Sequence, residues 1–146
     1  MTTMTIQDAS RRTRLSEPTL RYYEEVGLVG PILRDDRSGH RRYRETDVDD
    51  LQILACLRAM GMGIDEMRTY QANRALGNAA AGEQRDILTK HATRIEGEIA
   101  TLHIHLEYLS ANAALWDARD KGDVALEAEA KTRVDAILPQ LEGALR

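Results

Sequence analysis

The clearest hydrophobic pattern in the chain lies in its second half, where apolar residues recur at alternating spacings of four and three. These residues are Leu88, Ala92, Ile95, Ile99, Leu102, Leu106, Leu109, Ala113 and Trp116. The spacing is the heptad repeat of a coiled coil and predicts one helix over 82–118. A chain of 146 residues cannot bury so long a stripe against its own body alone. We therefore expect a homodimer, and the pattern leaves parallel and antiparallel pairing open.

Capping residues and glycine mark two shorter helices near the start of the chain. Thr5 precedes a polar and apolar pattern that predicts a helix to about Thr13, and Ser16 begins a second helix that Gly27 ends. Two helices about ten residues long with a short connection have the spacing of a helix-turn-helix. The segment 33–43 that follows has turn residues at its centre and arginines on both arms, which predicts a β-hairpin, or wing.

A third helix is predicted over about 46–60. A fourth has Asp65 and Glu66 in its first turn and runs to about Leu76, followed by a break of small residues over 77–82. The last segment carries apolar residues on one side, and Pro139 is expected to break or kink it. The residues on that side are Val134, Ile137, Leu138, Leu141 and Leu145. The predicted fold is mainly α. It comprises a winged helix-turn-helix domain over 1–76, a coiled-coil dimerisation helix over 82–118 and a helical tail over 119–146, the last a candidate effector region.

The charge of the chain is divided unevenly along its length. The formal net charge is −4, yet residues 1–44 hold nine Arg and no Lys against six acidic residues. A basic first part on an acidic remainder is typical of a protein that contacts nucleic-acid phosphate with one end. Arginine in particular is suited to bidentate contacts with phosphate or guanine.

Three motifs in sequence order resemble the MerR family of transcription regulators. They are Leu20-Arg21-Tyr22-Tyr23-Glu24-Glu25-Val26-Gly27-Leu28, then Ser38-Gly39-His40-Arg41-Arg42-Tyr43, then Leu57-Arg58-Ala59-Met60-Gly61-Met62. The resemblance covers about 1–116 and is nearest to the NmlR/AdhR-like branch. One departure is His40, where the family usually has Tyr. The resemblance implies a homodimer with an antiparallel coiled coil, which binds a near-palindrome in promoter DNA and distorts it for RNA polymerase when an effector acts.

The predicted DNA-binding residues lie on the second helix, on the wing and on the third helix. Helix 17–26 is expected to enter the major groove, with its first residues at base edges and the rest, like the wing, at the backbone. The set is Ser16, Glu17, Thr19, Arg21, Tyr22, Tyr23, Arg34, His40, Arg41, Arg42, Tyr43 and Arg58. The alternative is that the tyrosines belong to the core and the arginines to a solvated surface.

The effector is constrained by the cysteine content. Cys56 is the one cysteine, so a thiolate-bound soft metal or an iron–sulfur cluster is not expected, and neither is a disulfide within the chain. In the NmlR/AdhR-like branch the cysteine at this position is the proposed sensor of thiol-reactive electrophiles or oxidants. The alternative is a small buried hydrophobe. A further hypothesis is an organic ligand held by Tyr108, Leu109, Trp116 and the last helix, against simple packing of that helix.

Other classes of function are weakly supported by the sequence. Nucleotide-binding glycine loops and nucleophile motifs are absent, so we expect neither an enzyme nor a cofactor. The chain has no signal-peptide or transmembrane pattern, which predicts a cytoplasmic protein without membrane contact. The remaining alternative is a coiled-coil adaptor whose basic head binds an acidic protein. A steep loss of affinity with salt and a preference for a palindrome would distinguish a DNA-binding protein from it.

Overall fold

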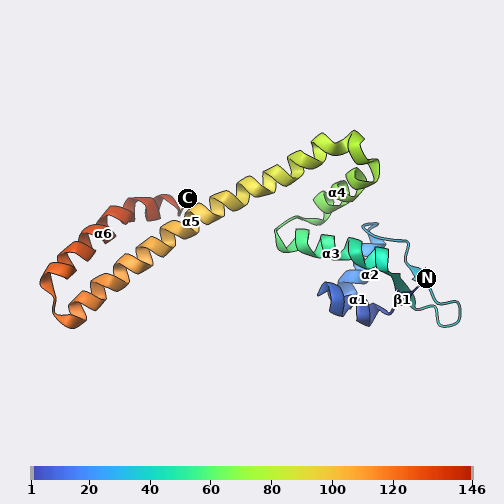
Figure 1. Ribbon diagram of the computed structural model, residues 1–146, viewed down its shortest axis with the longest axis horizontal. Coiled ribbons are helices and arrows are strands. Elements are labelled where there is room, and N and C mark those ends of the chain that lie inside the picture. Colours follow the sequence, from blue (N-terminus) through green and yellow to red (C-terminus); the bar gives the residue numbers. More distant parts are fainter. Residues whose placement is uncertain (1, 146) are drawn as a thin grey trace. The chain divides into compact units, whose positions relative to one another are not determined.

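The computed structural model describes residues 2–145 and divides into two compact units, residues 1–91 and 92–146. We call the first unit the head and the second the helical hairpin. Figure 1 shows their helices and strands, coloured in sequence order. Among the described residues, no helix is long and apolar enough to cross a membrane.

The head begins with the predicted helix-turn-helix. Helix α1 (Ile6–Thr13) is capped by Thr5, whose hydroxyl accepts from the Asp8 N–H at 3.2 Å. Helix α2 (Glu17–Glu25) is capped by Ser16, whose hydroxyl accepts from the Thr19 N–H at 3.2 Å. Each cap satisfies a backbone donor that the helix itself leaves free. The prediction of both helices and their starts is confirmed.

A small antiparallel sheet forms the wing and its base. Strands β2 (Leu33–Arg34) and β3 (Arg41–Arg44) form the predicted hairpin, and β1 (Thr3–Met4) pairs with the other edge of β3 to give the order β1-β3-β2. At the hairpin turn, the carboxylate of Asp35 accepts backbone N–H groups at 2.8 and 3.0 Å. The sequence did not indicate β1, because two residues are too few for an alternating pattern.

Two further helices complete the core of the head. Helix α3 (Glu45–Ala59) follows β3 directly, and helix α4 (Ile64–Leu76) follows a short turn. Leucines and methionines of α3 and α4 pack against α1, α2 and β3 in one cluster of buried side chains. Its largest fully buried members are Tyr23, Tyr43, Leu20, Leu51, Leu54, Met67 and Val48.

The predicted break between the fourth helix and the long helix is much smaller than expected. A single 3₁₀ turn, η1 (Gly77–Ala80), leads directly into α5 (Ala81–Lys121), which has 41 residues. The first turns of α5 belong to the head and are tied to α4 by side chains. Gln84 donates to the Tyr70 carbonyl at 3.0 Å, and Lys90 donates to Glu66 at 2.9 Å. The small residues thus turn the chain without separating the two helices.

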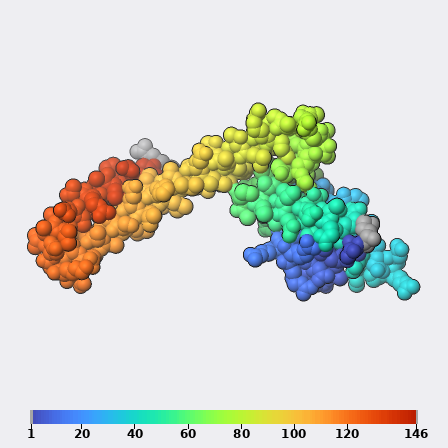
Figure 2. All heavy atoms as spheres, viewed as in Figure 1, coloured from blue at the N-terminus to red at the C-terminus, as the bar shows by residue number. Residues whose placement is uncertain are grey.

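The helical hairpin consists of the later part of α5 and of α6 (Val124–Gly143), which lies along it (Figures 1 and 2). Gly122, with φ of 68°, makes the turn, and Asp123 caps α6. The predicted break at Pro139 is wrong, because Pro139 lies inside α6 and the helix continues past it. Ile137 packs against the hairpin core before it and Leu141 is half-buried after it, so apolar burial favours continuing the helix.

Helix α5 presents two different apolar faces in the hairpin. One face, with Ala111 and Leu115, packs against Ala130 and Val134 of α6 and is closed to solvent. The other is the heptad stripe, where Ile99, Leu102, Leu106, Leu109 and Trp116 are 49–64% exposed. In the single chain, α6 therefore buries one apolar face of α5, and the predicted dimerisation stripe stays exposed.

Candidate nucleic-acid interface

Helix α2 buries one side and exposes a polar one. Leu20 and Tyr23, three residues apart, point into the core, as the helical period requires. Ser16, Arg21 and Tyr22 are exposed, and the Arg21 guanidinium lies 3.6 Å from the carboxylate of Glu17 one turn earlier. The exposed face is therefore polar, and its one basic side chain, Arg21, is held near Glu17.

This face of α2 meets the wing in one depression of about 290 Å³. Its lining residues are Thr5, Ile6, Gln7, Glu17, Arg21, Arg34, Asp35, Ser38, Gly39, His40, Arg41 and Arg42. The structure thus brings together predicted DNA-binding residues of α2 and the wing, and adds residues at the start of α1 that the sequence analysis did not single out. Its lining has four arginines against two acidic residues, so the depression is suited to an anionic group.

Glu24 in the last turn of α2 connects that helix to the wing. Its carboxylate accepts from the Ile32 N–H at 2.9 Å and from Arg41 Nε at 2.7 Å, and Arg34 Nη2 lies 4.0 Å away. Burial by itself raises the pKa of Glu24, but these hydrogen bonds and the two guanidinium charges outweigh it and lower the pKa below its ordinary value. Glu24 is therefore ionised at neutral pH. The motif contained this residue, but nothing in the sequence assigned it a partner.

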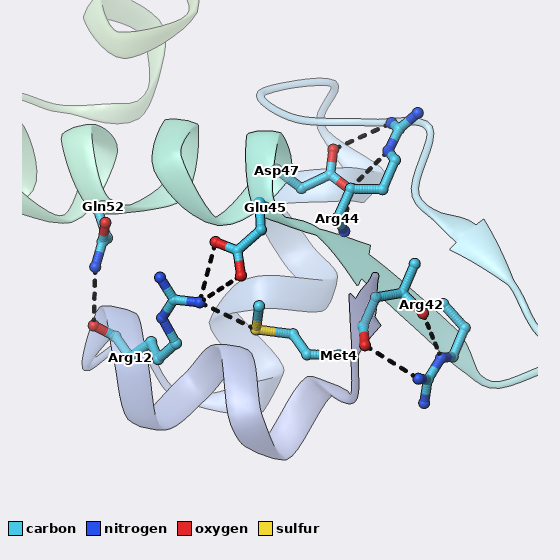
Figure 3. A network of polar contacts seen from close by, with 8 residues as sticks. Met4, Arg12, Arg42, Arg44, Glu45, Asp47 and Gln52 are labelled. Carbon is cyan, nitrogen blue, oxygen red and sulfur yellow. Dashed lines mark hydrogen bonds and ion pairs between the residues drawn. The ribbon is translucent and has the colours of Figure 1, made fainter. Parts of the chain in front are cut away.

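The other arginines of β3 are held at the base of the wing (Figure 3). Arg42 donates to the hydroxyl and the carbonyl oxygen of Thr3 at 3.1 and 3.3 Å. Arg44 donates to both carboxylate oxygens of Asp47 at 3.1 Å, and its N–H donates to the same side chain at 2.9 Å. In contrast, Arg34 on β2 is exposed and donates only to the Gly39 carbonyl among the hydrogen bonds described. The wing thus has anchored arginines on β3 and a solvent-facing one on β2.

A second set of polar contacts joins α1 to α3 (Figure 3). Arg12 Nη1 donates to both carboxylate oxygens of Glu45 at 2.9 and 3.1 Å, and Gln52 donates to the Arg12 carbonyl at 3.4 Å. The Arg12 side chain also approaches the Met4 sulfur at 4.0 Å. These contacts fix the first helix of the helix-turn-helix against the helix that follows the wing.

The prediction of DNA contacts is wrong for two of the three tyrosines. Tyr23 is 2% exposed and Tyr43 is fully buried, so both rings belong to the core rather than to the surface. The Tyr43 hydroxyl has no hydrogen-bond partner among the described residues, and burial raises its pKa. Tyr22 is exposed. The alternative interpretation of the tyrosines thus holds for Tyr23 and Tyr43 but not for Tyr22.

Cys56 and Arg58 are both exposed on α3. They line a shallow groove of about 860 Å³ together with Arg12 and Arg14, so the thiol lies in basic surroundings. The interpretation of Cys56 as a small buried hydrophobe is wrong for the single chain, because its side chain faces solvent. Its neighbours Ile53 and Leu57 turn toward the core and provide the apolar packing instead.

The three residues proposed to hold an organic ligand differ in their surroundings in the hairpin. Tyr108 packs against the hairpin core and its hydroxyl accepts from Asn112 at 3.3 Å, whereas Leu109 is exposed on the heptad stripe. Trp116 is also exposed and carries the Arg119 guanidinium 4.6 Å from its ring centre. A depression of about 170 Å³ between α5 and α6 is lined by other residues. Among residues 2–145, no three His, Cys, Asp or Glu side chains are grouped to hold a metal ion.

A helix-turn-helix with a wing, both presenting basic side chains, defines the class of winged helix-turn-helix DNA-binding proteins. The model of the MerR HTH family regulatory protein matches residues 4–73. The regulator HmrR of Rhizobium leguminosarum bv. viciae is 35% identical over 99 residues, which are 68% of this chain and 75% of HmrR. The chain belongs to the MerR family.

Further relatives agree with this assignment. The regulator AdhR of Bacillus subtilis is 33% identical over 92 residues, 63% of this chain and 65% of AdhR. A further match is the structure of HiNmlR, a MerR family regulator lacking the sensor domain and bound to promoter DNA. It matches this chain with a TM-score of 0.69 and 25% sequence identity, and the match covers 92% of this chain and 95% of HiNmlR. A Listeria monocytogenes regulator, at 23% identity and a TM-score of 0.67, over 93% and 98% of the two chains, shares the fold. The predicted family and fold class are confirmed.

Proposed function

We propose that the protein regulates transcription by binding promoter DNA with the exposed face of α2 and the wing. The observation that carries this proposal is the single depression shared by Glu17 and Arg21 of α2 and by Arg34 and His40 of the wing. The similar protein HiNmlR was solved on promoter DNA, which supports the same ligand here. The named relatives are transcriptional regulators, so we assign a regulatory rather than an enzymatic function, and a cytoplasmic place of action.

The residues are proposed to divide between base edges and backbone. Ser16, Glu17 and Thr19 lie in the first turn of α2 or at its cap, where a recognition helix reads bases. Arg21, Arg34 and His40 line the depression that contains Glu17 and are proposed to hold phosphate. The exposed Tyr22 on α2 and Arg58 on α3 are proposed to do the same. Arg41 and Arg42 are engaged within the head and are proposed to shape the wing. Only the contacts of α2 with base edges carry sequence information directly.

A homodimer is proposed to bind a near-palindromic site through its two heads. The heptad stripe of α5 supports this, because monomeric proteins rarely leave a continuous apolar stripe of this length in water. Two heads at fixed separation would require two half-sites and would allow the protein to bend or untwist the DNA between them. Realignment of promoter elements for RNA polymerase by that distortion is the proposed mechanism of activation.

For the effector, we propose a thiol-reactive electrophile or oxidant that acts at Cys56. The exposure of the thiol and the arginines that line its groove support reaction with such reagents. The alternative is a regulator that responds to another small molecule, with Cys56 unreactive. Labelling of the native protein with iodoacetamide, followed by transcription with Cys56→Ser, separates the two. An inert thiol, or a variant that still responds to an aldehyde, would eliminate the Cys56 proposal.

The DNA-binding proposal is tested by selection from a random duplex library, followed by footprinting upstream of the protein's own gene. We expect a near-palindromic selected sequence, protection between the −35 and −10 elements and a steep loss of affinity with salt. Arg21→Gln should reduce that affinity, whereas Lys131→Gln, an exposed charge on α6, should not. A chain that selects no sequence and binds an acidic protein instead would support the adaptor hypothesis.

A further inference from the structure

One carboxylate is shared by the recognition helix and both arms of the wing. Glu24 lies in the last turn of α2, and its two oxygens accept from Ile32, just before β2, and from Arg41 on β3. The distances are 2.9 and 2.7 Å, both within the normal range of a hydrogen bond. Among residues 2–145, no backbone hydrogen bond joins α2 to the strands, so Glu24 provides a direct polar connection between the two surfaces proposed to contact DNA.

The backbone next to the wing is shaped to allow this contact. Gly30 has a φ of 97°, in the left-handed region that favours glycine. A Cβ at this position would lie 2.8 Å from the Ile32 nitrogen and 3.3 Å from Glu24 Cγ. A side chain would therefore collide with the donor and the acceptor side chain of the same hydrogen bond. The close approach of the chain to Glu24 depends on the missing side chain of Gly30.

The contact also removes one arginine from the exposed surface of the wing. The side chains of Arg41 and Glu24 are only 17% and 15% exposed, whereas that of Arg34 is 51% exposed. A charge-assisted hydrogen bond at low exposure is stronger than one in water, so the Arg41 guanidinium is held rather than offered to an external anion. The wing carries fewer available cations than its sequence suggests.

We propose that Glu24 is a positioning residue that aligns the wing with α2 and withholds Arg41 from DNA phosphate, so that tight binding requires the correct base sequence. This inference rests on the proposed function of α2 and the wing in DNA binding. Phosphate contacts are the same for every sequence, whereas base contacts form only in the correct register. A wing fixed to α2 reaches phosphate best when α2 is also in register. A loose wing with a free Arg41 would reach phosphate on any duplex.

The test compares Glu24→Gln, Arg41→Gln and the control Gln71→Ala. Gln keeps the size of Glu24 and one acceptor oxygen but loses the charge. Gln71 donates to the Leu28 carbonyl at 3.1 Å, so its loss weakens the same connecting segment. Gln71 also accepts from Arg74 at 2.9 Å, but Arg74 keeps Asp50 as a partner at 3.2 Å, so the variant frees no arginine of the wing. Each full-length variant is titrated at several salt concentrations against two probes. One probe is the duplex selected by the wild-type protein from a random library, and the other is a shuffled duplex of equal composition.

For Glu24→Gln we expect tighter binding to the shuffled duplex, with a salt dependence steeper by about 0.9 in log–log slope, the value for one added phosphate contact. The preference for the selected duplex should fall about tenfold, as for loss of one charge-assisted hydrogen bond that aligns the wing. Arg41→Gln should leave the slope on the shuffled duplex unchanged, because the guanidinium is already engaged. Gln71→Ala should lower the melting temperature and leave preference and slope as in the wild type.

Three results would overturn the inference. They are an unchanged preference in folded Glu24→Gln, an equal loss of preference in Gln71→Ala, and a shallower slope in Arg41→Gln, which would make Arg41 a phosphate contact. The Arg41→Gln arm stands even if Glu24→Gln does not fold. A wild-type chain that selects no duplex would refute the proposed function itself, which distinguishes that failure from failure of the Glu24 inference.

Discussion

Replacing Leu102 by Ala tests the proposed role of the heptad stripe on α5. Leu102 is 63% exposed in the single chain and lies at the middle of the stripe, between Ile99 and Leu106. Its side chain does not belong to the cluster that packs α6 against α5. We therefore expect Leu102→Ala to weaken the dimer while the fold of each chain stays intact.

The size of the effect follows from the apolar surface that dimerisation would cover. Leu→Ala removes three carbons, each worth about 0.8 kcal/mol when fully buried. With 63% of the side chain available for burial, the loss is about 1.5 kcal/mol per chain and about 3 kcal/mol per dimer. Because about 1.4 kcal/mol corresponds to a factor of ten, the dissociation constant of the dimer should rise about a hundredfold.

Sedimentation equilibrium of the full-length protein over a range of concentrations measures this constant. The matched control is Leu33→Ala, the same substitution at a 39% exposed leucine on the wing, which should leave the dimer unchanged. Circular dichroism should show the same helix content in both variants. A monomeric wild-type chain, or an equal dissociation constant for Leu102→Ala and wild type, would refute the assignment of the stripe as the dimer interface.

Three further predictions concern the head. Tyr43→Phe removes a buried hydroxyl that has no partner among the described residues, so urea unfolding should show unchanged or higher stability, and a loss above about 1 kcal/mol would contradict the structure. Gly30→Ala forces a Cβ to within 2.8 Å of the Ile32 nitrogen at a positive φ, and should cost about 1–3 kcal/mol in the same assay. Glu24 and Glu66 both have pKa values below the ordinary 4.5, so their contribution to stability is complete above that pH and is lost as pH falls through the lower folded value. Unfolding followed from neutral to acid pH should therefore show a weaker acid dependence below 4.5 in Glu24→Gln than in wild type, and equal curves would contradict the assignment.

Local signals in the sequence were sufficient to predict the first two helices and the residues at which they begin. Thr5 and Ser16 accept the backbone N–H groups that their positions before helical segments suggested. The heptad spacing was sufficient to predict α5, because the period of the apolar residues specifies both the helix and the stripe along it. It did not reveal the second face of α5, where the small Ala111 packs against Ala130 and Val134 of α6. Small residues carry little periodic signal, so that packing became visible only in the structure.

The two tyrosines of the α2 motif illustrate a limit of motif-based assignment. Tyr22 and Tyr23 are neighbours in sequence but lie about 100° apart around a helix, so only one of them can share a face with Leu20. The spacing of three between Leu20 and Tyr23 contained that signal, and Tyr23 is the buried one. A family motif names residues that matter without separating those that shape the core from those that face a ligand.

The sequence could not show which arginines of the wing are engaged within the head and which are exposed, because their partners are distant in the chain. Arg41 is held by Glu24, 17 residues away, and Arg42 by Thr3, 39 residues away. A count of nine arginines in residues 1–44 therefore overstates the cations available to DNA. Since each phosphate contact adds about 0.9 to the slope of affinity against salt, the measured slope should correspond to the exposed arginines of each head rather than to all of them. The engaged arginines of β3 instead hold the wing against α2 and β1, and so help to position the exposed arginines for contact with DNA.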